Sequence, residues 1–296
     1  MRKHITTVIV CIMFTAGLSL LLYPFMANQW NNYRQSQLLT TYEEAVTEMV
    51  ETGRVDYEAE WAQAQNYNED LIPYILPDSF STAEYPQEGD AKYLSCLNLT
   101  GDGMMGYIQI PKISVKIPIY HTTSDEVLQK AAGHLAGSSL PVGGAGTHAV
   151  ISAHRGLPSA ALFTDLDKLQ EGDTFYLSVL DDTLCYEVDL ITVVDPTETE
   201  ALAAQEGEDL VTLLTCTPYG VNSHRLLVRG HRIPYMELGE DAIPAASGSG
   251  LVGPSMHTSY LLWVIIGLAV TALFITLLYL YDRRKRKAAS AGRKPR

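Results

Sequence analysis

The sequence predicts a mainly β fold, a closed barrel or a sandwich, preceded by helices and flanked by two membrane spans. Short apolar, β-prone runs separated by turn residues follow one another from about residue 105 onward. Before residue 65, apolar residues recur at helical spacing instead. Near the two ends lie 22-residue stretches without a charge, Ile5 to Met26 and Tyr260 to Tyr281.

Each uncharged stretch has the length of a transmembrane helix. At about 1.5 Å per residue, either would reach roughly 33 Å, enough for a hydrocarbon core of about 30 Å. Arg2 and Lys3 precede the first stretch, and a basic run over residues 283–287 follows the second. The positive-inside rule then places both termini in the cytoplasm and residues 28–258 outside. A cleaved signal peptide is the alternative for the first stretch, but its length and the lack of a small-x-small cleavage site favour an uncleaved anchor.

Two helices are expected between the first span and the β region. The helical pattern covers roughly residues 29–50 and, after Gly53, residues 55–64, which indicates a stalk or a packed collar. Residues 68–103 show no period and contain several prolines, and loops of this length are usually functional or disordered.

The β region contains seven recognisable strands and two short helices. Turn signals such as Gly143-Gly144 and Asp181-Asp182 separate the strands, as expected for a barrel or a sandwich. The helices are expected around Asp125–Ala132 and Ser159–Leu169. The predicted strands are Gly106–Ile110, Val115–Tyr120, His148–His154, Thr174–Leu180, Leu184–Val194, Leu210–Cys216 and Leu226–Arg232.

Charge restricts the partners of the predicted outer region. Residues 28–258 hold 11 of the 21 Lys and Arg and 33 of the 34 Asp and Glu, a formal charge of −22. Nucleic acids and anionic lipid surfaces require cationic protein surface, so neither is an expected partner. A basic or amine-bearing partner is compatible with this charge, and so is a purely solubilising role for the acidic residues.

The cysteines do not form a disulfide framework. Cys11 lies in the first span, and Cys96, Cys185 and Cys216 leave an odd number outside. A Cys96–Cys185 bond stays possible, although apolar packing is the preferred role for both. No Cys-x-x-Cys or His-x-x-x-His cluster is present, so neither a metal nor a cofactor is expected.

The segment from Val211 to Gly230 carries the strongest functional signal. An apolar run ends at Cys216, a loop with turn residues follows, and a second apolar run opens with Arg225. Paired as a hairpin, the runs would bring a thiol next to a fixed cation, which favours the nucleophilic thiolate. The alternative is an inert buried cysteine beside a surface charge.

A cysteine nucleophile needs a proton acceptor and donor, usually histidine. His4 and His257 are excluded by their location, which leaves six candidates. His154 ends an apolar strand and precedes Arg155-Gly156, where an accessible side chain is expected. His148 shares its strand face by alternation, so periodicity alone does not decide between the two histidines.

Over most of residues 98–235 the chain resembles class C sortases, the pilus-assembling cysteine transpeptidases of Gram-positive bacteria. Six blocks carry this resemblance, and the Thr-Leu-x-Thr-Cys signature is the most specific. The blocks are Gly101-Asp-Gly-Met-Met-Gly-Tyr-Ile-Gln-Ile-Pro-Lys-Ile113, Ile117-Pro-Ile-Tyr-His121, Gly133-His-Leu-Ala-Gly-Ser-Ser-Leu-Pro-Val-Gly143, Ala153-His-Arg-Gly-Leu-Pro-Ser-Ala160, Thr212-Leu-Leu-Thr-Cys-Thr-Pro-Tyr-Gly220 and His224-Arg-Leu-Leu-Val-Arg229.

The resemblance implies an eight-stranded sortase barrel with Cys216 as nucleophile, His154 as acid and base, and Arg225 as oxyanion or substrate stabiliser. Its substrates would be pilins or surface proteins with an LPXTG-like sorting signal, and a lysine amine of the next pilin would accept the acyl group. A housekeeping-type sortase that attaches proteins to the cell wall is the alternative enzyme. A non-catalytic, membrane-anchored binding module is the alternative outside enzymes.

Class C sortases also carry a lid with an Asp-Pro-aromatic motif. The corresponding residues here are Pro77-Asp78-Ser79-Phe80, with serine in place of the expected proline. The resemblance implies that Asp78 pairs with Arg225 and that Phe80 covers Cys216, and an ordinary acidic linker is the alternative.

Together these observations predict a two-pass protein of the cell membrane with an extracellular catalytic domain. Its predicted parts, in chain order, are an N-terminal transmembrane anchor (1–27), a helical stalk (28–67), a lid and linker (68–103), the barrel (104–235), a second linker (236–259), a transmembrane helix (260–281) and a basic cytoplasmic tail (282–296).

Overall fold

The computed structural model describes residues 2–71, 76–80, 91–235 and 276 of the 296-residue chain. The chain divides into two compact units, residues 26–252 and a second unit formed by the two chain ends. Along the described parts of the chain, no helix is both long and apolar enough to cross a membrane. Apart from Thr276, the predicted second linker, second span and basic tail lie outside the described residues. Both membrane spans stay predictions.

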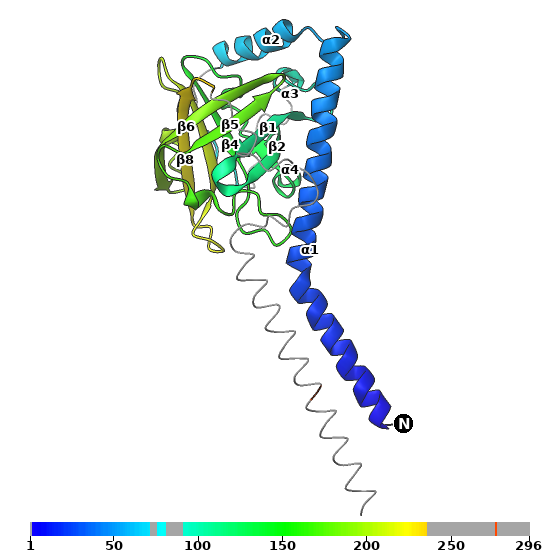
Figure 1. The fold of residues 1–296 in the computed structure, drawn as a ribbon. Coiled ribbons are helices and arrows are strands. Elements are labelled where there is room, and N and C mark those ends of the chain that lie inside the picture. Colours follow the sequence, from blue (N-terminus) through cyan, green and yellow to red (C-terminus); the bar gives the residue numbers. More distant parts are fainter. Residues whose placement is uncertain (1, 72–75, 81–90, 236–275, 277–296) are drawn as a thin grey trace, which may run out of the picture. The chain divides into compact units, whose positions relative to one another are not determined.

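Within the described part of the chain, eight strands close into a barrel, as expected (Figure 1). The order around the barrel is β1-β2-β3-β4-β7-β8-β6-β5, with β1 paired to β5. The pairs β2/β3 and β4/β7 are parallel and the other pairs antiparallel. The strands are β1 (Met104–Ile110), β2 (Val115–His121), β3 (Ala132–His134), β4 (Thr147–Ser152), β5 (Thr174–Val179), β6 (Asp182–Val194), β7 (Asp209–Thr217) and β8 (His224–Ile233).

All seven predicted strands are present, with ends shifted by a few residues. The strand that sequence reasoning missed is β3, whose three residues are too few to show a period. The predicted strand ending at His154 stops instead at Ser152, so His154 lies in a loop. Only the first part of the helix predicted over 125–132 forms, as α4 (Asp125–Leu128), because Ala132 already belongs to β3.

The helix predicted over Ser159–Leu169 is wrong. The chain forms only a single 3₁₀ turn there, η2 (Leu166–Lys168). The amide of Phe163 bonds back across the loop to the carbonyl of His154, at 3.1 Å, instead of to the residue four positions before it. Leu162 also takes a positive φ of 41°, which interrupts a helix. The apolar residues of this segment are buried by a loop that folds onto the core.

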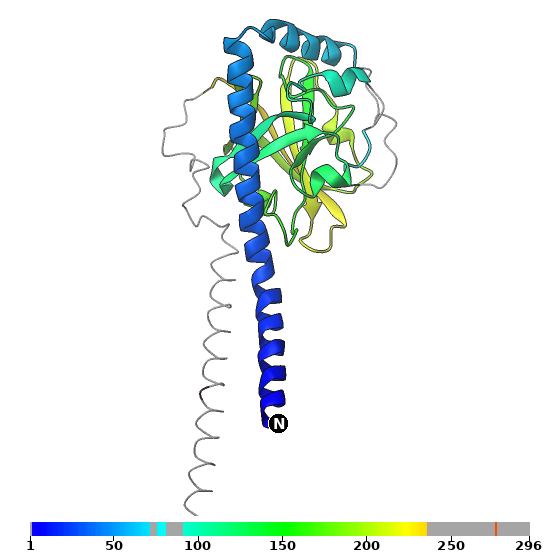
Figure 2. The same cartoon turned by 90° about the vertical axis from the view of Figure 1, so that its right-hand side faces the viewer.

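Helix α1 (Arg2–Glu51) extends beyond the predicted range at both ends, whereas α2 (Tyr57–Glu69) both begins and ends later than predicted. Within the unit formed by residues 26–252, α1 runs alongside the barrel (Figure 2). The buried face of α1 in this unit contains Leu39, Tyr42 and Val46, which pack with Met104 and Tyr120 of the barrel. The two helices are therefore a packed collar on the barrel and not a free stalk.

Hydrogen bonds attach α1 to the rest of this unit at three positions along the helix. The Tyr42 hydroxyl donates to the carbonyl of Met105, and the Gln35 amide donates to the carbonyl of Lys130. Farther toward the N-terminus, Asn28 accepts a hydrogen bond from the amide of Ala161.

A third helix, α3 (Ala91–Ser95), lies in the region predicted to be without periodic structure. It is too short for a periodic signal, and a tertiary contact explains it. Tyr93 is fully buried, and its hydroxyl lies 2.9 Å from Nδ1 of His134. The other ring nitrogen of His134 lies 2.8 Å from the carbonyl of Ser139. A carbonyl can only accept, so this neutral imidazole carries its proton on Nε2 and accepts from Tyr93 at Nδ1.

Burial of these histidines makes the fold sensitive to acid. Desolvation lowers the pKa of His134 to about 4, against the hydrogen bond to Ser139, and it also lowers the pKa of His121. Both ring nitrogens of His121 lie near backbone carbonyls, those of Gly103, Tyr93 and Cys96. His121 and His134 are thus structural residues and leave the list of candidate acid–base groups.

We expect the free energy of unfolding to fall as the pH drops from 6.5 toward 4. Below pH 6.5 the unfolded chain binds a proton at His134, whereas the folded protein stays unprotonated there until the pH nears 4. This difference lowers the free energy of unfolding by about 3 kcal/mol at pH 4. Urea unfolding followed by intrinsic fluorescence measures the effect. In His134→Gln, which cannot titrate, the slope of stability against pH over this range should flatten, and an unaltered slope would contradict the assignment.

Candidate active site

The ends of three neighbouring strands form the site. Strand β4 pairs in parallel with β7, with Ser152 opposite Leu214 as the last pair. Strand β8 pairs with β7 in antiparallel fashion, with Cys216 opposite Arg225. The hairpin that brings the thiol and the guanidinium together is therefore confirmed.

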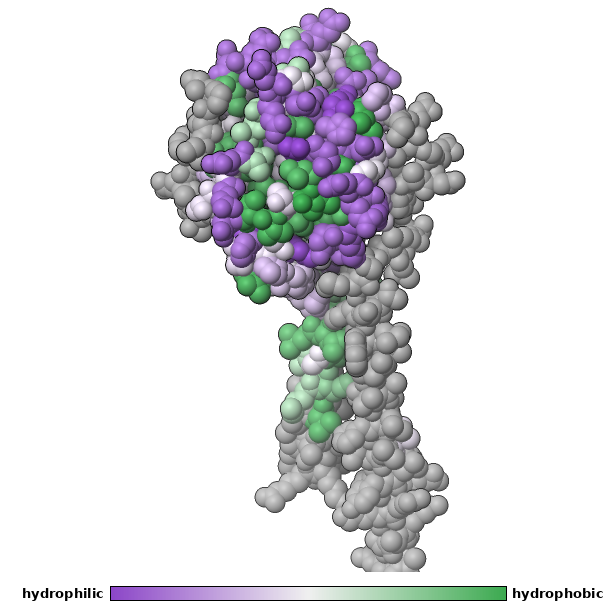
Figure 3. Space-filling model, turned by 90° about the vertical axis from the view of Figure 1, so that its left-hand side faces the viewer, coloured by the Kyte–Doolittle hydropathy of each residue, from purple (hydrophilic) through white to green (hydrophobic). Residues whose placement is uncertain are grey.

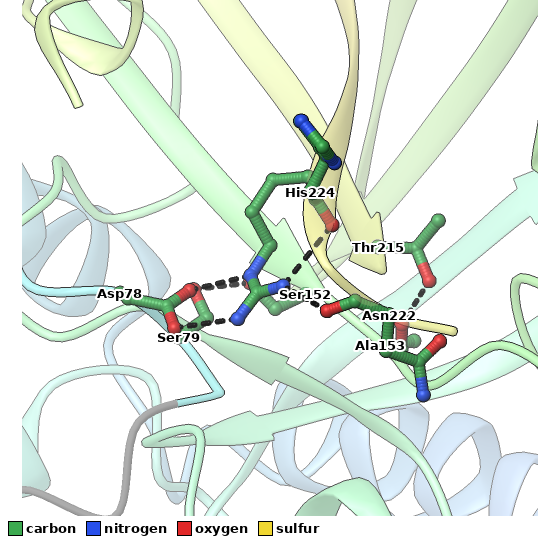
Figure 4. Close-up of polar contacts among 8 residues, drawn as sticks. Asp78, Ser79, Ser152, Ala153, Thr215, Asn222 and His224 are labelled. Carbon is green, nitrogen blue, oxygen red and sulfur yellow. Dashed lines mark hydrogen bonds and ion pairs between the residues drawn. The ribbon is translucent and has the colours of Figure 1, made fainter. Parts of the chain in front are cut away.

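The same register brings His154 level with Cys216, because each lies two residues beyond the Ser152–Leu214 pair. Two hydrogen bonds continue the pairing past the end of β4. The amide of Ala153 donates to the carbonyl of Leu214 at 3.2 Å, and the hydroxyl of Thr215 donates to the carbonyl of Ala153 at 2.7 Å. Figure 4 shows Ala153 and Thr215 joined in this way. The three predicted site residues thus lie in one row across three strand ends.

Strand alternation places this row on the outer face of the barrel wall. The opposite face carries Ile151, Leu213 and Val228, which belong to the main core cluster. Behind the row, on its own face, lies a smaller apolar cluster formed by Leu76, Leu135, Val150, Leu202, Leu214 and Leu227. The barrel core holds the strands in place, and the site lies on top of them.

A covering segment, residues 76–80, lies over this face. Leu76 is part of the small apolar cluster. Asp78 accepts two hydrogen bonds from Arg225, at 2.7 Å from both Nε and Nη2, in the two-pronged geometry that suits guanidinium and carboxylate (Figure 4). The Asp78–Arg225 pairing expected of a lid is present. The function of a lid stays a prediction for these residues.

Phe80, in the same covering segment, packs against two of the three site residues. Its ring centroid lies 5.3 Å from that of His154, and the guanidinium carbon of Arg225 lies 5.3 Å from the Phe80 ring. Phe80 therefore contacts the histidine and the arginine of the site. Cys216 is only 6% exposed, and direct cover of its sulfur by Phe80 stays a prediction.

Ser79, which replaces the expected proline, has a partner of its own. Its hydroxyl accepts a hydrogen bond of 2.7 Å from the hydroxyl of Ser152, and Ser79 is 1% exposed. Figure 4 shows both serines close to the Asp78–Arg225 pair. Proline could not make this bond, so the departure from the lid motif adds a second polar attachment. Sequence reasoning missed Ser152, because a serine inside an apolar strand gives no functional signal.

Burial in the covered site favours the neutral forms of the Cys216 thiol and the His154 imidazole. Burial raises the pKa of the Cys216 thiol; Arg225 counteracts this and the negative charge of Asp78 adds to it. Burial also lowers the pKa of His154, although the charge of Asp125 opposes this. With Asp78 bonded to Arg225, the cation that would favour a thiolate is partly neutralised.

The structure also separates His154 from His148. His148 is 1% exposed, and its ring nitrogens lie 2.9 Å from the carbonyl of Ala203 and 2.7 Å from the hydroxyl of Thr212. His154 is half-buried, and among the described residues no hydrogen bond is made to its ring. His154 is therefore the histidine free to exchange a proton beside Cys216.

Cys96 and Cys185 are both fully buried, and no disulfide joins them in the described part of the chain, where both pack in the interior. In the described ranges, no three His, Cys, Asp or Glu side chains are grouped so that they could hold a metal ion.

Some apolar side chains of β6 and of the loop after Cys216 are exposed. Hydrophilic residues surround one apolar area on the barrel face shown in Figure 3, which is the side of β6 and β8. On β6, Val193 is 55% exposed; in the loop after Cys216, Tyr219 is 48% and Val221 69% exposed.

Comparison with known proteins now identifies the barrel. A family model described as "Sortase domain" matches residues 108–233. The crystal structure of sortase C1 from Streptococcus agalactiae is 46% identical, with a TM-score of 0.61 over 68% of this chain and 100% of that one. Sortase C-1 from Actinomyces oris is 48% identical, with a TM-score of 0.57 over 60% of this chain and 99% of that one. The chain belongs to the sortase family.

A more distant relative, "Sortase A" of Bacillus anthracis, is 24% identical over 77% of this chain and 95% of its own length. As a sortase, the protein is a cysteine transpeptidase. The row of Cys216, His154 and Arg225 has the composition that such a reaction requires, a nucleophile, a proton-transfer group and a permanent cation.

We expect the double variant Asp78→Ala with Phe80→Ala to be alkylated at Cys216 about tenfold faster, since charge-assisted hydrogen bonds of this kind stabilise by about 1.5–3 kcal/mol. The pH profile of alkylation should move to lower pH, because Asp78 raises the pKa of Cys216 and its removal leaves Arg225 beside the thiolate. Iodoacetamide labelling followed by mass spectrometry measures both. Asp70→Ala, which removes an exposed pair with Lys92, is the control; an unchanged rate in the double variant would contradict a covering role.

A second prediction concerns the serine pair of the sortase. Ser152→Ala leaves the buried Ser79 hydroxyl without its donor, so alkylation should rise about fivefold for a bond of about 1 kcal/mol. Adding Ser79→Ala should bring little further change, because the bond is already lost. A double-mutant cycle on the alkylation rates measures the coupling, and strictly additive effects would show that the two hydroxyls do not hold the segment.

Proposed function

We propose that this sortase polymerises pilins. It would cleave an LPXTG-like sorting signal after the threonine, hold the acyl group on Cys216, and transfer it to a lysine amine of the next pilin. The covering segment carries the proposal, because Asp78 bonded to Arg225 and Phe80 against His154 match the lid expected of class C sortases.

The relatives support the same assignment. Among the similar solved structures is one titled "Pilus-related Sortase C of Group B Streptococcus", 43% identical over 66% of this chain and 96% of that one. Another, sortase C of Streptococcus pneumoniae, is 47% identical and its title refers to pilin substrate specificity.

The first half-reaction begins when residues 76–80 move off the site. Arg225, released from Asp78, then stabilises charge next to the thiol. His154 accepts the proton of the Cys216 thiol, and the resulting thiolate attacks the threonine carbonyl. The carbon–nitrogen bond to glycine then breaks, and protonated His154 delivers the proton to the departing amine. Arg225 is suited to the oxyanion because its guanidinium stays charged at any working pH.

The second half-reaction runs the proton transfer in reverse. Neutral His154 accepts a proton from the attacking lysine amine, the new amide bond forms, and Cys216 leaves as thiolate. An amine that arrives in a water-poor, covered site competes well with hydrolysis. The net negative charge of residues 28–258 is compatible with a basic acceptor segment.

We further propose that the protein is anchored in the cell membrane by residues 5–26 and 260–281, with the barrel outside and both termini in the cytoplasm. The absence of charge in these stretches and the basic residues on their outer flanks support this. An anchored polymerase would keep the growing pilus at the cell surface.

The acylation step is tested by incubating the soluble part, residues 28–258, with an LPXTG-type peptide. Mass spectrometry should find a thioester adduct on the Asp78→Ala, Phe80→Ala variant, and the adduct should disappear in Cys216→Ala. Absence of any adduct, even with the covering residues removed, would favour a non-catalytic binding module and overturn the proposal.

The accepting amine is tested separately on the preformed adduct. A lysine-containing peptide from a pilin should resolve the thioester faster than a cell-wall amine such as oligoglycine, with a product joined through the lysine side chain. Preferential transfer to the cell-wall amine would instead indicate a housekeeping-type sortase that anchors surface proteins.

A further inference from the structure

The parallel ladder between β4 and β7 stops short of the catalytic pair. Its last step is Ser152 opposite Leu214, two residues before His154 and Cys216. Cys216 itself is still held, because β7 continues to Thr217 and pairs with β8. Ala153 is still bonded to β7 beyond the end of β4, but in the described part of the chain His154 itself makes no hydrogen bond to a strand. Contacts that follow His154 in the chain can therefore contribute to its distance from the thiol.

The next residue, Arg155, makes the contacts that could do so. Its Nε donates to the carbonyl of Thr164 at 3.1 Å, and its Nη2 forms an ion pair with Asp167. Both partners lie in the histidine loop, residues 153–165 with the turn that follows. These contacts close the loop on itself, together with the bond from the amide of Gly156 to the hydroxyl of Thr164.

The same guanidinium reaches the cysteine loop, residues 217–223. Nη1 of Arg155 donates to the hydroxyl of Thr217, the residue after Cys216, at 3.4 Å. Only 9% of the Arg155 side chain is exposed, although its partner Asp167 is 46% exposed. The contact to Thr217 is therefore made away from bulk water, where a charged donor is costly to leave unpaired.

Tyr219 adds a cation–π contact between the same two loops. The guanidinium carbon of Arg155 lies 5.9 Å from its ring centroid. Gly156 has a φ of 80°, and a Cβ at that position would lie 3.0 Å from a Tyr219 ring carbon. The ring thus rests against backbone that has no room for a side chain. Arg155 and Gly156 therefore both contact Tyr219, on one side of the cysteine loop.

We propose that Arg155 is a positioning residue that clasps the loop after His154 to the loop after Cys216 and so sets the separation of the two catalytic groups. Its planar fork serves this role, because three nitrogens in fixed directions bind Thr164, Asp167 and Thr217 at once. No contact joins its side chain to Cys216 or to the His154 ring among the described residues, so it acts through the backbone of both loops. The inference rests on the sortase chemistry proposed above.

The clasp matters most for the step in which His154 must protonate the departing amine. Misplacement of a catalytic group by about 1 Å can cost about 100-fold in rate. A thiol leaving group, with a pKa near 8.5, departs as thiolate without a proton donor. Loss of the clasp should therefore impair cleavage of an amide far more than cleavage of a thioester with the same acyl part.

The test compares Arg155→Ala with the wild type, both as full chains and both carrying Asp78→Ala and Phe80→Ala. On an LPXTG-type amide peptide, kcat should fall about 100-fold with KM within about threefold. On the matching peptide thioester, the fall in kcat should be less than about tenfold, and iodoacetamide labelling of Cys216 should be unchanged within about twofold. Arg155→Lys keeps the charge but lacks the fork, so it should not restore amide cleavage.

Arg54→Ala removes an exposed pair with Glu48 and serves as the matched control. If Arg155→Ala does not fold, Thr217→Val removes one arm of the clasp with little change of shape and should show the same preference for the thioester, to a smaller degree. Equal losses on amide and thioester, a parallel loss of labelling, or full rescue by lysine would overturn the inference. If the wild type itself forms no thioester adduct, the proposed function fails instead, which is a separate result.

Discussion

The parallel pairing of β4 with β7 is the constraint on which the site depends. It brings together two segments that are about sixty residues apart in the chain and sets their register at Ser152 and Leu214. Because β7 also pairs with β8, one strand aligns a residue on each side, with His154 on the β4 side and Arg225 on the β8 side of Cys216. Parallel strands cannot be joined by a short hairpin, so the barrel core must hold this pair together. The apolar interior, with Ile151, Leu213 and Val228, supplies that support.

The covering segment, residues 76–80, controls the reactivity of Cys216 and His154. Burial alone disfavours both a thiolate at Cys216 and an imidazolium at His154. Asp78 strengthens the effect, since it binds the cation that would otherwise favour the thiolate. The covering segment thus restrains the chemistry electrostatically as well as sterically. Ser79 adds a hydroxyl contact that a proline-containing lid would lack.

The loops that carry the site are held by polar contacts and the strands by apolar ones. Arg155 links the two catalytic loops, and Asn28 of α1 accepts a hydrogen bond from Ala161 in the histidine loop. Buried Tyr93 and His134 similarly fix α3 to the barrel. These contacts lie where strand pairing ends, and there directional hydrogen bonds replace the regular ladder as the source of geometry.

Much of this could be read from the chain alone, where the signal is local. Short apolar, β-prone runs between turn residues predicted seven of the eight strands, and the Cys216–Arg225 hairpin followed from two apolar runs around a turn-rich loop. Periodicity did not decide between His154 and His148, because both share one strand face by alternation, and only the family resemblance pointed to His154. The structure does so through the partners of His148 on distant segments, Ala203 and Thr212. The strand β3 was missed because its three residues are too few to show a period, and the segment over 159–169 folds back onto the carbonyl of His154 instead of forming a helix. The roles of Ser152 and Arg155 depend on Ser79 and Thr217, which lie far away in the chain. Local periodicity contains no information about such distant partners, so only the tertiary structure decides these roles.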